Sequence, residues 1–140
     1  MKNNLIQGIS HITFIVKELD KATKFFKDIF EAEEIYSSGD KAFSISREKF
    51  FLINDLWIVV MEGKNIDRSY NHIAFKIKEA DFEIYLNRIE SLGLNIEEGR
   101  KRVIGEGDSI YFYDYDNHLF ELHTGTLETR LIRYQKEKTD

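Results

Sequence analysis

Glu121 is a carboxylate in the middle of residues 119–123 (LFELH), whose aromatic and branched side chains predict a β-strand. Side chains alternate across a strand, so Glu121 shares one face with Leu119 and His123. Burying a carboxylate is costly unless a partner satisfies it. We therefore expect either that a cation lies beside Glu121 or that this face of the strand is exposed to solvent.

Two histidines provide further ligands for such a cation. His11 lies in SHITFIV at residues 10–16, and His72 stands at the matching place in YNHIAFKI at residues 70–77. If the two copies pair with pseudo-symmetry, both histidines converge with Glu121. Two imidazoles and a carboxylate with open coordination positions suit a divalent metal of intermediate hardness. The competing interpretation is that the histidines are structural and Glu121 faces water; the repeat match favours metal.

The elements that must position these residues form one pattern given twice, strand-helix-strand-strand-strand. We predict a single α+β domain over residues 1–140, built of two paired βαβββ modules. Module one takes about residues 5–63 and module two about residues 70–125, followed by a C-terminal helix over about residues 126–136.

Module one is expected to begin with a strand at 6–16, followed by a helix and three strands at 34–37, 42–46 and 56–61. Apolar residues at helical spacing define the buried stripe of that helix, namely Ala22, Phe25, Phe26, Ile29 and Phe30. Asp20 is its expected N-cap, and Leu19 is the apolar residue before the cap.

Module two is expected to repeat this order, with strands at 70–77, 94–97, 110–113 and 119–123. Its helix carries an apolar stripe and should stop at Gly93; the stripe consists of Phe82, Tyr85, Leu86, Ile89 and Leu92. The polar cluster at 114–117 predicts the turn between the last two strands.

Composition excludes several classes of function. The net charge of −5 argues against a general binder of nucleic acid or of acidic membranes. The absence of cysteine excludes a disulfide framework, a thiolate metal site and a cysteine nucleophile. Without a signal-peptide core or an apolar run of membrane-spanning length, a cytoplasmic protein is expected.

Several short stretches together carry a family resemblance: SHIT at 10–13, YNHIAF at 70–75, GEGDS at 105–109, YF at 111–112 and FELH at 120–123. With the paired modules, they make the chain resemble the vicinal oxygen chelate superfamily of glyoxalases, bleomycin resistance proteins and dioxygenases. Within it the chain is similar to fosfomycin resistance proteins. IYSSGDK at 35–41 and SREKFF at 46–51 resemble the manganese-dependent fosfomycin epoxide hydrolases, the FosX group.

The resemblance implies that His11, His72 and Glu121 hold Mn²⁺, although other divalent metals, Fe(II) among them, suit the same ligands. It also implies a domain-swapped homodimer in which one chain's His11 joins the other chain's His72 and Glu121. The metal would act as a Lewis acid on the oxirane oxygen of fosfomycin.

Two residues of module one receive catalytic roles from the resemblance. Glu48 matches the general base that activates water for attack on the carbon bearing the phosphonate, which gives the diol. Thr13 matches a threonine near the oxirane. From the residues alone, Glu48 between Arg47 and Lys49 also fits a solvated run of charges.

The substrate is a small phosphonate dianion, so its site needs cations and hydrogen-bond donors. The residues that the resemblance implies for this role are Ser109, Tyr111, Arg130 and one or both of Lys101 and Arg102. Trp57 and Tyr70 are further candidates for the pocket wall. Ordinary alternatives remain: a surface position for Arg130 and core packing for Trp57.

Two departures from related patterns bear on the subclass. Fosfomycin thiol transferases that resemble this chain commonly carry a serine where Gly105 stands, which favours water as the nucleophile here. Asn117 replaces the glycine of the superfamily's usual turn and should tolerate the same left-handed conformation. The alternatives left open are a thiol transferase that uses glutathione, bacillithiol or cysteine, and a metal-free drug-binding protein of the same fold.

Overall fold

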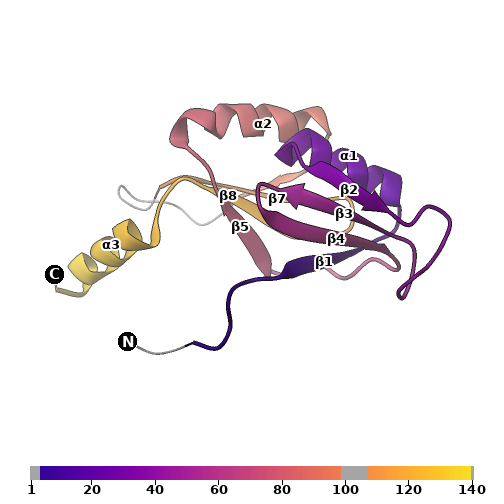
Figure 1. Ribbon diagram of the computed structural model, residues 1–140. Helices are drawn as coiled ribbons and strands as arrows, with labels where there is room; N and C mark the ends of the chain where they lie inside the picture. The colour runs from indigo at the N-terminus through magenta and orange to yellow at the C-terminus, as the bar shows by residue number, and fades with distance from the viewer. Residues whose placement is uncertain (1–3, 99–106, 140) are drawn as a thin grey trace. The chain divides into compact units, whose positions relative to one another are not determined.

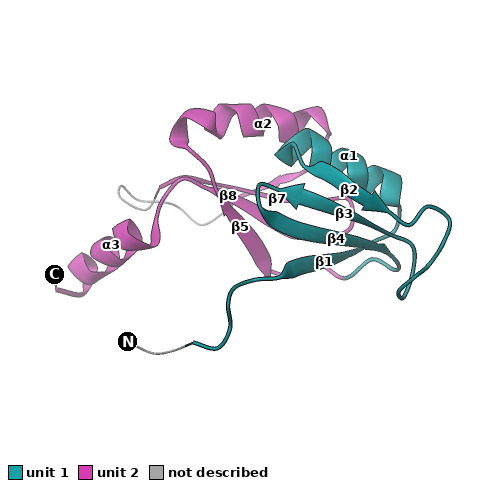
Figure 2. Cartoon of the chain, in the orientation of Figure 1, with its two compact units in different colours: residues 1–66 teal, residues 67–140 magenta. Residues whose placement is uncertain are grey.

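The computed structural model describes residues 4–98 and 107–139. The chain divides into two compact units, which we call unit 1 (Met1–Ile66) and unit 2 (Asp67–Asp140) (Figure 2). Each unit contains one four-stranded sheet. No helix within the described ranges is both long and apolar enough to cross a membrane.

Unit 1 contains four strands and one helix: β1 (His11–Val16), α1 (Leu19–Phe30), β2 (Glu33–Ser37), β3 (Glu48–Ile53) and β4 (Leu56–Glu62) (Figure 1). The strand order is β1-β4-β3-β2, with β1 parallel to β4 and the other pairs antiparallel. The helix thus connects two strands that end up on opposite edges of the sheet.

Unit 2 repeats this arrangement with β5 (His72–Lys76), the short helix η1 (Glu79–Asp81), α2 (Phe82–Ser91), β6 (Ile96–Glu97), β7 (Ser109–Tyr113), β8 (Leu119–His123) and α3 (Leu127–Thr139). Its strand order is β5-β8-β7-β6, and β5 is parallel to β8. The predicted α+β fold of two βαβββ modules is therefore confirmed.

The core of unit 1 lies between α1 and one face of its sheet. Phe25, Phe26 and Ile29 from the helix are fully buried, as the spacing of the apolar residues predicted. Phe26 stacks on Phe51 of β3 with ring centroids 5.6 Å apart. Since α1 covers this face, the side chains of alternate strand residues point to the opposite face, which is where the candidate site residues of unit 1 lie.

The prediction of a strand at residues 42–46 is wrong, because the strand β3 lies at Glu48–Ile53 instead. Ile53 pairs directly with Leu56, so only Asn54 and Asp55 connect β3 to β4. Asn54 takes a left-handed conformation with φ 53°, which a tight two-residue hairpin requires. This hairpin fixes the register and places the strand immediately before β4.

Two predicted boundaries in module one are also corrected. The helix begins at Leu19 after Glu18, and no side-chain hydrogen bond caps it, so Asp20 is not the N-cap. Asp20 lies in the first turn, where its negative charge stabilises the helix by interacting with the positive end of the helix dipole. The first strand starts at His11 rather than at Ile6, which is exposed.

The turn between β7 and β8 is organised by the carboxylate of Asp114. Its Oδ1 accepts hydrogen bonds from the backbone N–H groups of Asp116 and His118, both at 2.8 Å, and its Oδ2 lies 2.8 Å from Nδ1 of His118. Asn117 has φ 69°, which confirms the left-handed residue expected there. This buried turn fixes the register that places Glu121 on β8.

Candidate metal and anion site

The register of unit 2 gathers the candidate residues on one face of its sheet. Glu121 on β8 lies opposite Tyr111 on β7 and Ala74 on β5. His72 starts β5 on the same face, and Ser109 lies two residues before Tyr111. The alternation of strand side chains thus brings together residues that are far apart in the sequence.

The Glu121 carboxylate is 5% exposed and is surrounded by polar side chains. Ser109 Oγ donates to its Oε2 at 2.6 Å, and His72 Nε2 lies 3.0 Å from its Oε1. Burial raises the pKa of the Glu121 carboxyl, but effects led by the hydrogen bonds from Ser109 and Tyr111 lower it more. The pKa therefore lies below its ordinary value, and Glu121 is an anion.

The orientation of His72 fits a metal ligand. Its Nδ1 lies 2.7 Å from the carbonyl oxygen of Tyr70, which can only accept a hydrogen bond, so Nδ1 carries the proton. The other nitrogen, Nε2, faces Oε1 of Glu121 at 3.0 Å, so a cation bound there would be held by both groups. Metal-binding imidazoles are commonly fixed in this way by a carbonyl behind the ring. One nitrogen and one carboxylate therefore form two ligands suited to a divalent cation.

A third ligand does not join these two within the part of the chain that the structure describes. Over residues 4–98 and 107–139, no group of three His, Cys, Asp or Glu side chains is gathered at metal-binding separation. His11 belongs to unit 1, whereas His72 and Glu121 belong to unit 2. The predicted set of three ligands thus remains a prediction, of which the structure brings two together.

The residues predicted to bind the phosphonate in unit 2 lie beside Glu121. Ser109 Oγ is 2.7 Å from Nδ1 of His123, and Nη2 of Arg130 is 3.3 Å from Nε2 of the same ring. The Tyr70 and Tyr111 hydroxyls are 3.5 Å apart, with their rings stacked. Lys101, Arg102 and Gly105 lie outside the described residues.

His123 is a site residue to which the sequence interpretation gave no role. It stands two residues after Glu121, so strand alternation alone places it on the same face. Its pairing with Ser109 depends on the register of β7 against β8, in which the two residues lie opposite each other. That register becomes visible only in the structure.

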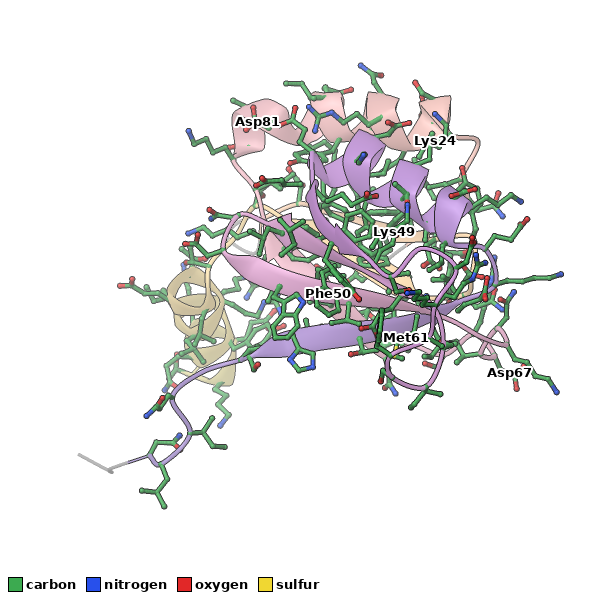
Figure 3. All side chains as sticks on the ribbon, turned by 45° about the vertical axis from the view of Figure 1, so that its right-hand side comes forward. Lys24, Lys49, Phe50, Met61, Asp67 and Asp81 are labelled. Carbon is green, nitrogen blue, oxygen red and sulfur yellow. The ribbon has the colours of Figure 1, made fainter. Side chains whose placement is uncertain are left out.

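The candidate residues of unit 1 share the sheet face away from α1. The register forms three rows on that face, which consist of His11, Trp57 and Leu52, then Thr13, Val59 and Phe50, and finally Ile15, Met61 and Glu48. Figure 3 shows Lys49 toward α1, while Phe50 and Met61 lie farther from that helix. His11 and Glu48 are thus on one face, with their rows about 13 Å apart along the strands.

His11 packs against Trp57 with ring centroids 4.3 Å apart. Its Nδ1 lies 3.0 Å from the Ser10 hydroxyl, which leaves Nε2 facing away from that contact. The indole Nε1 of Trp57 is buried and has no hydrogen-bond acceptor among the residues described here. A buried N–H without an acceptor is costly, so this face is suited to a polar ligand beside His11.

Glu48 is only 8% exposed, so it is not part of a solvated charge run. Its neighbours Arg47 and Lys49 alternate to the other face, where Arg47 pairs with Glu62 and Lys49 pairs with Glu34 at 3.0 Å. The backbone of Glu48 is held by Ser38, which accepts at 3.0 Å with its hydroxyl from the Glu48 N–H and donates its own N–H to the Glu48 carbonyl. These two hydrogen bonds fix the backbone of Glu48, whose carboxylate lies on the sheet face away from α1.

A separate cavity of about 410 Å³ lies at the N-terminal end of α1. Its charged lining residues carry four positive and four negative side chains, namely Lys17, Lys21, Arg47, Lys49, Glu18, Asp20, Asp40 and Glu62. Several of these charges pair with one another, as Arg47 does with Asp40 and Glu62. None of the candidate site residues lines this cavity, so we do not assign the chemistry to it.

Comparison with known proteins agrees with this geometry. The family model of the Glyoxalase/Bleomycin resistance protein/Dioxygenase superfamily matches residues 8–122. The fosfomycin resistance protein FosX of Listeria innocua is 62% identical over 133 residues, which cover 94% of this chain and 100% of that protein. The metallothiol transferase FosB of Bacillus licheniformis is 40% identical over 143 residues, which cover 99% and 88%.

A solved structure is similarly close. It is a variant of FosX from Listeria monocytogenes complexed with Mn(II) and 1S,2S-dihydroxypropylphosphonic acid. It is 58% identical and matches with a TM-score of 0.85, covering 93% of this chain and 99% of that chain. With the family match over most of the sequence and the two βαβββ units, this chain belongs to the glyoxalase/bleomycin resistance protein/dioxygenase superfamily.

Proposed function

We propose that this protein is a fosfomycin resistance enzyme that hydrates the oxirane of fosfomycin to the diol in a Mn²⁺-dependent reaction. The observation that carries the proposal is the 3.0 Å pairing of His72 with Glu121 beside the anion-binding residues Ser109 and Arg130. Support comes from relatives named FosX at 56–62% identity. A FosX structure also contains Mn(II) with the dihydroxypropylphosphonic acid that hydration would yield.

The metal would be held by His11, His72 and Glu121. When bound, Mn²⁺ supplies Lewis acidity at the oxirane oxygen. Tyr70 supports this role by fixing the His72 tautomer, and Ser109 and Tyr111 keep Glu121 ionised through hydrogen bonds. In line with the family resemblance, we propose that two chains form a homodimer in which one chain's His11 joins the other chain's His72 and Glu121.

Glu48 would act as the general base, taking a proton from water as it attacks the carbon that bears the phosphonate. Its burial and its place on the face of His11 support this role. Thr13 occupies the row between the two, so we propose that the oxirane lies over Thr13. Glu48 would then take the proton from a water on its own side of Thr13.

The phosphonate would be bound by Ser109, Tyr111 and Arg130, with Lys101 or Arg102 as an additional cation. Hydroxyl donors and a guanidinium suit a dianion because charge-assisted hydrogen bonds to phosphonate oxygens are strong. Trp57, whose buried indole N–H lacks an acceptor in the described part of the chain, and Tyr70 would complete the wall. We further propose that the reaction takes place in the cytoplasm.

Thiol transfer is the competing function, because relatives named metallothiol transferase FosB match at about 40% identity. The two reactions are separated by running the reaction in ¹⁸O-labelled water with Mn²⁺ and no thiol. We expect a product heavier than fosfomycin by one labelled water. A product that forms only when a thiol is added, and that carries the thiol, would instead favour thiol transfer.

A further inference from the structure

His123, the last residue of β8, has contacts that the proposed reaction does not yet use. Its Nδ1 is 2.7 Å from Ser109 Oγ, and its Nε2 is 3.3 Å from Nη2 of Arg130. Ser109 in turn donates to Oε2 of Glu121 at 2.6 Å. One imidazole thus contacts two residues that are proposed to bind the phosphonate, one on a strand and the other on α3.

The direction of these hydrogen bonds follows from the chemistry of the groups. A guanidinium has donors only, so the nitrogen of His123 that faces Arg130 must accept. A neutral imidazole then carries its proton on Nδ1 and donates it to Ser109 Oγ. The Ser109 proton must point elsewhere, and it points at Glu121. The chain of donors therefore runs one way, from Arg130 through His123 and Ser109 to the carboxylate.

We propose that His123 is a positioning residue that holds Ser109 and Arg130 as hydrogen-bond donors for an anionic ligand. Because His123 donates to Ser109 Oγ, the serine hydroxyl can only donate outward. Its acceptor in the structure is Oε2 of Glu121, and rotation of the hydroxyl would let it donate to a phosphonate oxygen instead. The same ring limits the freedom of the Arg130 side chain, which lowers the entropic cost of ordering it on the ligand.

This inference rests on the proposed function for the identity of the anion, but its test does not depend on hydration. A histidine that merely filled space could be replaced by any side chain of similar volume. A positioning histidine needs both nitrogens, and its two contacts can be tested separately. The amide of an asparagine reaches the place of Nδ1, whereas that of a glutamine reaches the place of Nε2.

We would therefore compare His123→Asn, His123→Gln and His123→Leu. Asparagine can still donate to Ser109, glutamine can still accept from Arg130, and leucine can do neither. Losing one such hydrogen bond weakens binding by about tenfold. We expect KM for fosfomycin and Kd for inorganic phosphate to rise about tenfold in the first two variants and about a hundredfold in the third. We expect kcat and the Kd for Mn²⁺ to stay within about threefold.

Arg130→Gln and Arg133→Gln provide a matched pair of controls on α3. Arg130 contacts His123, whereas Arg133 pairs with Glu137 at 2.7 Å. Only Arg130→Gln should weaken phosphate binding. When it is combined with His123→Gln, the loss of binding free energy should not exceed the sum of the losses in the two single variants. Circular dichroism and thermal midpoints verify that each variant is folded.

The inference is overturned if His123→Leu binds phosphate as tightly as the unaltered protein. It is also overturned if Mn²⁺ affinity falls in parallel with phosphate affinity in all three variants, because His123 would then act on the metal ligands. A protein that binds phosphate in a His123-dependent way but leaves fosfomycin unchanged would contradict the proposed function and support this inference.

Discussion

The two units share a strand order but place different chemistry at equivalent positions. Rows of side chains can be counted along each sheet from His11 in unit 1 and from His72 in unit 2. In the next row on the same face, β4 of unit 1 has Val59, whereas β8 of unit 2 has Glu121. The same scaffold position is thus apolar in one unit and a metal-ligand candidate in the other.

The following row sharpens this contrast. In unit 2, Ser109 and His123 lie opposite each other and are hydrogen-bonded. In unit 1 the equivalent positions hold Glu48 and Met61. A thioether is a poor hydrogen-bond partner, so Glu48 receives no such network from its opposite residue. Unit 2 therefore presents a connected network of polar side chains, whereas Glu48 in the described part of unit 1 lies opposite the apolar Met61.

The largest effect should come from Glu121→Gln, which removes the anion of unit 2 and keeps its shape. We expect the affinity for Mn²⁺ to fall by more than about a hundredfold and fosfomycin consumption to be lost, because replacing even a residue that only hydrogen-bonds to a metal ligand costs about 10–100-fold. Calorimetric titration with Mn²⁺ measures the loss. Glu97→Gln, on β6 of the same sheet, is the control and should bind Mn²⁺ normally.

Glu48→Gln tests the Glu48 carboxylate of unit 1. We expect Mn²⁺ affinity to be kept and hydration to fall by about 10²–10⁴-fold, because amides cannot accept the proton of the attacking water. Steady-state kinetics and a Mn²⁺ titration on the same preparation separate the two effects. Full activity in this variant would remove Glu48 from the mechanism, and Glu33→Gln on the exposed edge strand β2 serves as the control.

The helices α1 and α2 also differ in how many of their residues are buried, and this difference predicts how much a core substitution in each helix destabilises the protein. Six residues of α1 are buried, whereas Ile89 is the only buried residue of α2. We expect Phe26→Ala to lower the free energy of unfolding by about 3–5 kcal/mol, since it removes a fully buried ring. Leu86→Ala, on the half-buried stripe of α2, should cost less. Urea denaturation measures both, and equal losses would contradict the contrast.

The smallest effect concerns pH and the surface pair of Arg47 with Glu62. The hydrogen bond from Arg47 lowers the pKa of the Glu62 carboxyl below its ordinary value of 4.5, against a smaller effect of burial. A lowered folded-state pKa gives stability that is present above the unfolded pKa and is lost as the pH falls through the folded value. The thermal midpoint of Glu62→Gln should therefore lie slightly below that of the unaltered protein at pH 7. The difference should shrink as the pH falls below the ordinary carboxyl pKa of 4.5 and through the lowered value of the folded state.

The repeat and the core of module one could be predicted because their signals are local. The helical spacing of Phe25, Phe26 and Ile29 identifies α1. The similar surroundings of His11 and His72 reveal the second copy. Asn117 also has the left-handed conformation expected from its residue type.

The errors arise where tertiary pairing decides the structure. Residues 42–46 have strand composition, yet the two-residue turn at Asn54 pairs the following segment with β4 instead. The burial of Glu48 could not be read from its charged neighbours, because those alternate to the other face of the strand. The contact of His123 with Ser109 depends on the register of β7 against β8, which no local pattern gives.

In the proposed reaction, the polar network of unit 2 and the Glu48 carboxylate of unit 1 together add water to fosfomycin. The most direct test is ³¹P NMR of fosfomycin with the Mn²⁺-loaded protein, with and without a thiol. We predict that the fosfomycin resonance is replaced by that of the dihydroxypropylphosphonic acid at the same rate in both samples, and that chelating the metal stops the change. An unchanged resonance without thiol, and a thiol adduct once thiol is added, would contradict the account.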